Sequence, residues 1–415
     1  MNLEIAGRRI HISWILAVGM LLRVLYVWCG RHAQPTATDG YETIALSLLE
    51  RGEYAMVPGV PTSFREPGFP LFIAAIYGAF GVHPSVVLLL QCALSTATGW
   101  LLWLTGRRLF SEQVAGTALI VFLIYPQSIY YCAYFFRETW LCFWFAVLCW
   151  SSLSWSAPHG NNAGDRGAAL GGFAAMVFGL TNSAVLPACV LAGVLLGFAA
   201  PTRGRPRRIA IYFLPPLIAF AAWSVRNWSI HGRFVLGSTH GGEEFLQALV
   251  VPPEDLGTER QSDYIRATPD FAEVSGLPEA ESNDRLMKAS LRWISAHPGI
   301  YASRLAAGLA KYWKPWPYRR AYKHSYLVLM ILSLMSDAWI IPLGFVGLWL
   351  FRARWKEFPA FPASLAAMTF VYGAVHAVIR YRLPLMGGMI LLACAAIAQL
   401  ARSLTQNSRI DAHGR

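Results

Sequence analysis

Charge is scarce in this chain of 415 residues. Asp, Glu, Lys and Arg make up 14% of the sequence, and hydrophobic residues make up 55%. Soluble domains carry about 25% charged residues, so the composition excludes an ordinary soluble domain. The sequence also lacks a Gly-rich nucleotide loop, an HExxH motif and a CxxC motif. The sequence therefore contains no recognisable motif for binding a nucleotide sugar or ATP. It also shows no internal repeat that would suggest a structure in two halves.

Cysteine is sparse too and carries no pattern. There are seven cysteines, and five lie inside hydrophobic runs, where cysteine behaves as a small apolar residue. Nothing in the spacing of Cys29 and Cys132 indicates a disulfide or a metal site.

Long hydrophobic runs dominate what is present. A membrane span needs roughly 20 apolar residues, and on that scale the sequence predicts an all-α integral membrane protein with about ten transmembrane helices. Arg23 within the first run, and the lack of a small-residue cleavage site, favour an uncleaved helix over a signal peptide. The segment 69–81 is too short to span easily, so we expect a re-entrant or interfacial helix there. The predicted spans are 12–28, 84–106, 112–130, 137–155, 167–182, 183–200, 208–226, 325–350, 359–379 and 383–402.

The net charge of +12 follows the topology. With a cytoplasmic N-terminus, the basic loops at 107–108, 203–208 and 352–356 all fall on the cytoplasmic side, as the positive-inside rule requires. The positive charge therefore does not indicate nucleic acid.

This orientation predicts three regions. Residues 1–226 form an N-terminal transmembrane module with a first outer loop at 29–68, and residues 325–415 form the last transmembrane helices and a cytoplasmic tail. Between them, 227–324 is an acid-rich outer region in which we expect short helices broken at 297–299, forming a lid.

The first outer loop holds four candidate site residues. Asp39 begins a helical pattern that includes Tyr41. Asp39 is either an N-cap or a carboxylate fixed at the outer face, where it could take a proton from a hydroxyl. Arg65 and Glu66 are either a solvated pair or a site at which the arginine meets phosphate.

Further candidates lie at the outer ends of later helices. Arg137 and Glu138 interrupt an aromatic run, as an interfacial belt or as functional groups. Arg380 and Arg382 either snorkel to headgroups or bind a lipid-linked phosphate, with His376 one turn earlier.

A glycine- and hydroxyl-rich stretch at 232–242 opens the outer region. Its Ser238 and Thr239 suit an anion or a sugar. The alternative is a flexible exit loop.

These motifs, in this order, resemble the GT-C superfamily of polytopic glycosyltransferases. The similarity is greatest to its family-39-like bacterial branch, related to protein mannosyltransferases and aminoarabinose transferases. The matching motifs are Asp39-Gly40-Tyr41, Arg65-Glu66-Pro67-Gly68-Phe69-Pro70, Glu138 and Arg380-Tyr381-Arg382-Leu383-Pro384.

The resemblance implies a GT-C-type bundle and inverting transfer of a hexosyl or pentosyl unit from a polyprenyl-phosphate sugar. Asp39 matches the catalytic acid and would be the general base, with Glu138 orienting its neighbourhood. Arg380 and Arg382, with Arg65, would hold the donor phosphate. The substrate site would also include Tyr41, Glu66, Arg137, His376, Ser238 and Thr239.

Some relatives bind a divalent metal through an acid in the loop occupied here by 64–67. Arg65 stands at that place, so no metal ligands are predicted, and a Mg or Mn cofactor stays open. The implied partners are the donor, a glycan, lipid or protein acceptor, and membrane lipids, without nucleic acid. The implied location is the bacterial inner membrane, with the active site on the periplasmic side.

Two other classes of protein remain open. A transporter or flippase of a lipid-linked or anionic substrate would also place charges in a membrane cavity. A non-catalytic assembly subunit would tolerate replacement of Asp39.

Overall fold

The computed structural model describes residues 2–5, 8–30, 38–158, 162–252, 254–255, 258, 260–317 and 326–413. Parts of the predicted outer regions 29–68 and 227–324 lie outside these ranges. Two small antiparallel hairpins are the strands of the described chain: β1 (Asn2–Ile5) with β2 (Arg8–His11), and β3 (Ala55–Val57) with β4 (Val60–Pro61).

Helices make up nearly all the rest. The α-helices are α1 (Ile12–Gly30), α2 (Tyr41–Arg51), α3 (Gly68–Phe80), α4 (Pro84–Leu109), α5 (Glu112–Ile124), α6 (Pro126–Tyr130), α7 (Glu138–Ser152), α8 (Asn162–Thr181), α9 (Leu186–Ala199), α10 (Arg205–His231), α11 (Gly241–Val250), α12 (Arg260–Arg266), α13 (Pro269–Val274), α14 (Glu279–Ala296), α15 (Pro298–Tyr312), α16 (Tyr326–Leu350), α17 (Ala360–Ala374) and α18 (Leu383–His413). Short 3-10 helices are η2 (Thr38–Gly40), η3 (Tyr131–Ala133), η4 (Ser183–Val185), η6 (Arg352–Glu357) and η7 (Ile379–Arg382).

The all-helical membrane architecture is confirmed. Among the described residues, five segments are long and apolar enough to cross a membrane: α1, α4, α10, α16 and residues 379–406. The pair α5 and α6, bent by 56°, gives a sixth if it is one span. Shorter apolar helices are α3, α17 and the segment 183–199. The number of about ten spans therefore stays a prediction.

Small residues allow the helices to pack closely. In α8, a Cβ on Gly172 would lie 2.3 Å from the carbonyl oxygen of Tyr212 in α10, so only glycine permits this approach. Such contacts between small residues are how membrane helices associate, because burial from lipid gives no hydrophobic gain. The core runs along the first half of α18, where Leu385, Met386 and Met389 are fully buried against neighbouring helices.

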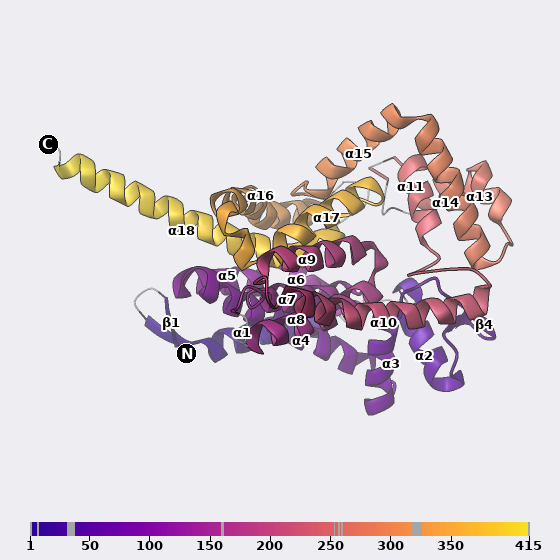
Figure 1. Ribbon diagram of the computed structural model, residues 1–415, viewed down its shortest axis with the longest axis horizontal. Coiled ribbons are helices and arrows are strands. Elements are labelled where there is room, and N and C mark those ends of the chain that lie inside the picture. Colours follow the sequence, from indigo (N-terminus) through magenta and orange to yellow (C-terminus); the bar gives the residue numbers. More distant parts are fainter. Residues whose placement is uncertain are drawn as a thin grey trace.

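The outer loops gather at one end of the bundle. In Figure 1, α2, β4 and the helices α11 to α15 lie at the right-hand end, while β1 and the end of α18 lie at the left. Helix α3 starts at this right-hand end and runs across the long axis (Figure 1), as an interfacial or re-entrant segment would. The arrangement brings together the segments that the sequence places on the outer face.

Helices α11 to α14 carry a small core of their own, made by Leu246, Val251, Ile265, Val274 and Leu286. Helix α14 ends at Ala296 and α15 begins at Pro298, which is where the sequence predicts a break. We call helices α11 to α15 the lid.

Candidate active site at the outer end

Asp39 has an unusual backbone conformation. Its φ of 62° makes it the one described non-glycine residue in the left-handed region. Asp tolerates this region better than most residues, yet such a conformation costs roughly 1–3 kcal/mol and is typical of functional sites. The N-cap of α2 is Gly40, and no side chain caps this helix. The alternative in which Asp39 acts as a helix cap is therefore wrong.

The Asp39 carboxylate lies between two arginines. Arg65 Nη2 is 3.5 Å from Oδ1, and Arg380 Nη2 is 3.8 Å from Oδ2. Arg65 also donates from Nε to the Asp39 carbonyl oxygen at 3.0 Å, which fixes the backbone. Tight ion pairs of this kind measure about 2.7–2.9 Å. The carboxylate, whose side chain is 29% exposed, is thus held loosely and stays accessible.

Glu138 contacts Arg380, which in turn contacts Asp39. Its Oε1 lies 3.5 Å from Arg380 Nε, and its Oε2 has no hydrogen-bond partner in the described part of the chain. The Arg380 guanidinium also lies over the rings of Phe136 and Tyr381, at 5.1 and 5.0 Å. Glu138 is therefore a neighbour of this guanidinium, together with the two rings.

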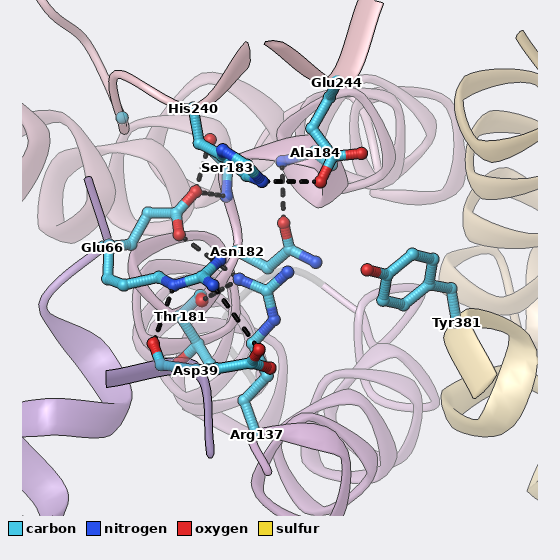
Figure 2. A network of polar contacts seen from close by, with 12 residues as sticks. Asp39, Glu66, Arg137, Thr181, Asn182, Ser183, Ala184, His240, Glu244 and Tyr381 are labelled. Carbon is cyan, nitrogen blue, oxygen red and sulfur yellow. Dashed lines mark hydrogen bonds and ion pairs between the residues drawn. The ribbon is translucent and has the colours of Figure 1, made fainter. Parts of the chain in front are cut away.

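Glu66 and Arg137 form a buried frame beside Asp39 (Figure 2). Arg137 Nη1 lies 3.3 Å from Glu66 Oε2 and donates to the Thr181 carbonyl at 3.2 Å. Glu66 Oε1 accepts from the backbone N–H of Ser183 at 2.8 Å and from its hydroxyl at 2.6 Å. These bonds tie the first outer loop to α7 and to the junction of α8 and α9.

Tyr41 packs against the same group of residues through Phe69 and Arg65. Its ring meets Phe69 edge to face at 5.2 Å, and the Arg65 guanidinium lies 5.4 Å from the ring centre. Burial raises the pKa of the Tyr41 hydroxyl to about 12, so it stays protonated at neutral pH.

A cavity of about 220 Å³ that is lined by charged, polar and apolar side chains includes Arg65, the ion-pair partner of Asp39, in its wall. We call it the polar chamber. Glu244 of the lid crosses one side, with Oε1 2.9 Å from His240 Nε2 and Oε2 bonded to His376 Nδ1. The chamber is lined by Phe64, Arg65, Glu66, Arg137, Asn182, Ser183, Ala184, Ser238, His240, Gly241, Glu244, Phe245, Val371, Tyr372, Val375, His376 and Tyr381.

Two predicted site residues lie elsewhere. Arg382 is fully buried, 2.5 Å from Asp337, and donates to the carbonyls of Tyr312 and Lys314. Residues two positions apart in the 3-10 helix η7 point in different directions, so Arg380 reaches Asp39 while Arg382 faces the interior. Contrary to expectation, Arg382 does not line the site.

Thr239 makes a structural contact with the lid. Its hydroxyl bonds to Glu279 of the lid, which accepts in addition from the Thr62 hydroxyl at 2.6 Å and the Ser63 N–H at 2.8 Å. The prediction that Thr239 binds substrate is not supported by this position, since the residue fastens the lid to the first outer loop.

Several residues of the chamber were not singled out from the sequence. Asn182 and Ser183 come from the polar break between two apolar runs, and that break was the available signal. His240, Glu244 and Tyr372 carried no local signal, because the lid and α17 meet only in the folded chain.

The residues around Asp39 do not fit a divalent cation. Such ions take several oxygen or nitrogen ligands, whereas the charged groups within 4 Å of this carboxylate are the guanidinium groups of Arg65 and Arg380. Within the described ranges, no group of three or more His, Cys, Asp or Glu residues could hold a metal ion.

Comparisons with known proteins gave matches among solved structures. No protein-family model and no curated protein matches the chain. The apo oligosaccharyltransferase of Archaeoglobus fulgidus is similar with a TM-score of 0.53 and 11% identity, over 96% of this chain and 51% of that one. Its complex with Zn and sulfate gives a TM-score of 0.51 and 12% identity, over 94% and 49%. This chain thus spans about half the length of the archaeal enzyme.

A bacterial structure is similar over more of its own length. ArnT from Cupriavidus metallidurans, bound to undecaprenyl phosphate, matches over 94% of this chain and 78% of that one, with 16% identity and a TM-score of 0.45. At these identities the similarity concerns the fold. The chain has the same overall fold as the archaeal oligosaccharyltransferase.

Proposed function

We propose that this protein is a glycosyltransferase that moves a sugar from a polyprenyl-phosphate donor to an acceptor hydroxyl, at the periplasmic face of a bacterial inner membrane. The observation that carries the proposal is the position of Asp39. Its accessible carboxylate lies between Arg65 and Arg380, at the end of the bundle where the outer loops gather. The fold shared with the archaeal oligosaccharyltransferase supports it.

In this proposal Asp39 is the general base. A carboxylate on a fixed backbone can take the proton of an acceptor hydroxyl as its oxygen attacks the anomeric carbon. The left-handed conformation and the bond from Arg65 Nε to the Asp39 carbonyl supply that rigidity. This use also accounts for the strain that the conformation stores.

The two arginines receive the leaving phosphate. When the anomeric carbon–oxygen bond breaks, the electron pair stays on the phosphate oxygen, whose charge becomes more negative. Guanidinium groups bind phosphate oxygens in forked geometry and stabilise this charge. Arg65 Nη2 and Arg380 Nη2 lie 3.5 and 3.8 Å from the Asp39 carboxylate, so both ends can engage a phosphate while Arg65 Nε keeps its bond to the Asp39 carbonyl.

A single displacement of this kind inverts the anomeric configuration. The base and the attacking hydroxyl must lie on the face of the sugar opposite the phosphate. The described site has one accessible carboxylate beside the arginines, and Glu138 is buried with an exposed side-chain fraction of 3%. A covalent glycosyl intermediate on a second carboxylate is therefore not part of the proposal.

Glu138 is a positioning residue in this scheme. Its contact with Arg380 Nε keeps the outer edge of that guanidinium directed at Asp39. A change of Glu138 to Gln keeps the size and removes the charge, so we expect weaker donor binding with an intact fold.

The test is chemical profiling of a deletion strain. Without the protein, we expect one cell-envelope glycan to lose a sugar and the matching polyprenyl-phosphate sugar to accumulate. Wild type should restore the glycan, and Asp39→Asn should not. Asp263→Asn, an exposed change of the same kind in α12, is the matched control and should complement fully. Full complementation by Asp39→Asn would sink the proposed mechanism.

A further inference from the structure

The polar chamber adjoins the Asp39 site through two of its lining residues. Arg65 lines the chamber and pairs with Asp39. On the other side, Tyr381 lines it and accepts a hydrogen bond from Arg380 Nη2 at 3.2 Å. A group joined to a phosphate that sits between these two arginines would therefore reach into the chamber.

Both carboxylates of the chamber are already compensated. Glu66 is bonded through one oxygen to Ser183 and pairs through the other with Arg137. Glu244 engages His240 with one oxygen and His376 with the other. Neither is left as an uncompensated negative charge toward a ligand.

Cations of the chamber offset these two carboxylates, and Arg65 adds a further positive charge to the wall. Burial disfavours the charged form of His240, but its contacts with the carboxylates of Glu243 and Glu244 prevail and raise the pKa of the imidazole to about 9. Arg65 and Arg137 line the same space. A cationic group would meet these charges without a free carboxylate to receive it, and such like-charge placement is costly.

Neutral polar and aromatic groups complete the wall. Asn182 donates to the Tyr372 hydroxyl at 2.8 Å, and Ser238 lines the same cavity. Figure 2 shows the Tyr381 hydroxyl pointing across the open space toward Asn182. Amides, hydroxyls and ring faces together suit a sugar, which presents hydroxyl groups at its rim and apolar C–H faces.

The size of the chamber limits what it can take. Its volume of about 220 Å³ lies below the roughly 300–1,000 Å³ of pockets for drug-sized ligands. One sugar ring with its hydroxyl groups is of this scale, and a disaccharide is larger.

We propose that the polar chamber binds one uncharged sugar unit and discriminates against cationic amino sugars and against longer glycans. This inference rests on the proposed function, because the phosphate between Arg65 and Arg380 makes the donor's sugar the occupant. The same chemistry would also recognise a terminal sugar of an acceptor, and the experiment separates the two sources.

The experiment uses the full chain in lipid nanodiscs and three donor analogues. They are decaprenyl phosphate carrying a neutral hexose, a 4-amino pentose or a neutral disaccharide, each competed against labelled decaprenyl phosphate. We expect the hexose lipid to bind at least about tenfold more tightly than either of the others. Equal binding of the amino sugar or of the disaccharide would overturn the proposal.

A charge introduced into the chamber should change this preference. Ser238→Asp adds an uncompensated carboxylate, so the amino-sugar lipid should gain at least tenfold relative to the hexose lipid. Ser275→Asp adds the same charge on the exposed surface of the lid and should leave the ratio unchanged. An unchanged ratio in Ser238→Asp would show that the sugar lies elsewhere.

A second readout reports directly on occupation of the chamber. In a Cys29→Ser background, which removes the exposed cysteine, Ser238→Cys is labelled with maleimide in the presence of methyl glycosides or hexosyl lipid. Protection by the neutral lipid supports a donor sugar in the chamber. Protection by the neutral glycoside, with no binding of any decaprenyl phosphate, would refute the proposed donor and leave an acceptor sugar site. No protection by either would refute the sugar chamber itself.

Discussion

Removal of Asp337, the buried partner of Arg382, should lower the free energy of unfolding of this protein. Asp337 and Arg382 are both fully buried and 2.5 Å apart. Asp337 also accepts from the Tyr125 hydroxyl at 2.7 Å and from Gln127 at 3.2 Å. Asp337→Ala leaves a guanidinium without its counter-ion, and breaking a buried pair from one side costs about 3–5 kcal/mol.

A double variant separates the cost of the unpaired charge from that of the pair. Replacing a buried pair by apolar residues of similar volume is often neutral, so Asp337→Leu with Arg382→Met should recover most of the loss. Because η7 carries both arginines, Asp337→Ala should also weaken donor binding at Arg380. The double variant loses the bonds from Arg382 to two carbonyls and should recover donor binding only in part.

The assay is equilibrium unfolding in mixed micelles of mild detergent and SDS, followed by tryptophan fluorescence. A loss below about 1 kcal/mol for Asp337→Ala would refute the reasoning, because a counter-ion that can be removed so cheaply does not hold η7. Equal losses for the single and double variants would show that the charge itself is not the cause.

Three further predictions follow from single features. Transfer should be unchanged by EDTA, because arginines occupy the surroundings of Asp39; a loss that Mg or Mn restores would contradict this. The pKa of His240 is raised to about 9 from 6.5, so its stabilisation of the lid, up to about 3 kcal/mol, is complete below pH 6.5 and lost as pH rises through 9. Thermal unfolding should show this decline in wild type and lack it in His240→Gln. In Gly68→Ala the new Cβ would lie 2.4 Å from the Thr181 hydroxyl, so the detergent-purified variant should lose stability, whereas Gly52→Ala, with no atom within 4 Å, should show only its backbone cost.

The sequence predicted which residues gather around Asp39 better than it predicted their individual contacts. Asp39, Arg65, Glu138 and Arg380 are polar residues at the outer edges of apolar runs, and the alternation of basic loops placed all four on one face. A shared face makes contact among them possible, and the packing of the helices brings them together. The same reasoning could not separate Arg380 from Arg382, since both occupy the same edge and only the turn of η7 directs one to Asp39 and the other to Asp337.

Long-range pairings were beyond the reach of local patterns. Glu244 and His376 carry no motif, and their contact depends on how the lid rests on the bundle. The left-handed backbone of Asp39 was also hidden, because a residue of this type before glycine is equally typical of an ordinary helix cap. The fold class was accessible from hydropathy, whereas the number of spans was less so, because the glycine-rich α8 and the shorter α7 and α9 are weakly marked.

The central claim is that Asp39 performs chemistry on a lipid-linked sugar. Its most direct test is transfer in proteoliposomes that contain a decaprenyl-phosphate hexose and an envelope-glycan extract as acceptor, with donor binding measured in parallel. Asn tolerates the left-handed conformation as Asp does, so Asp39→Asn should bind the donor normally while turnover falls at least about 10²-fold. Near-normal turnover in this variant would contradict the account, as would a wild-type protein that only moves the intact lipid across the bilayer.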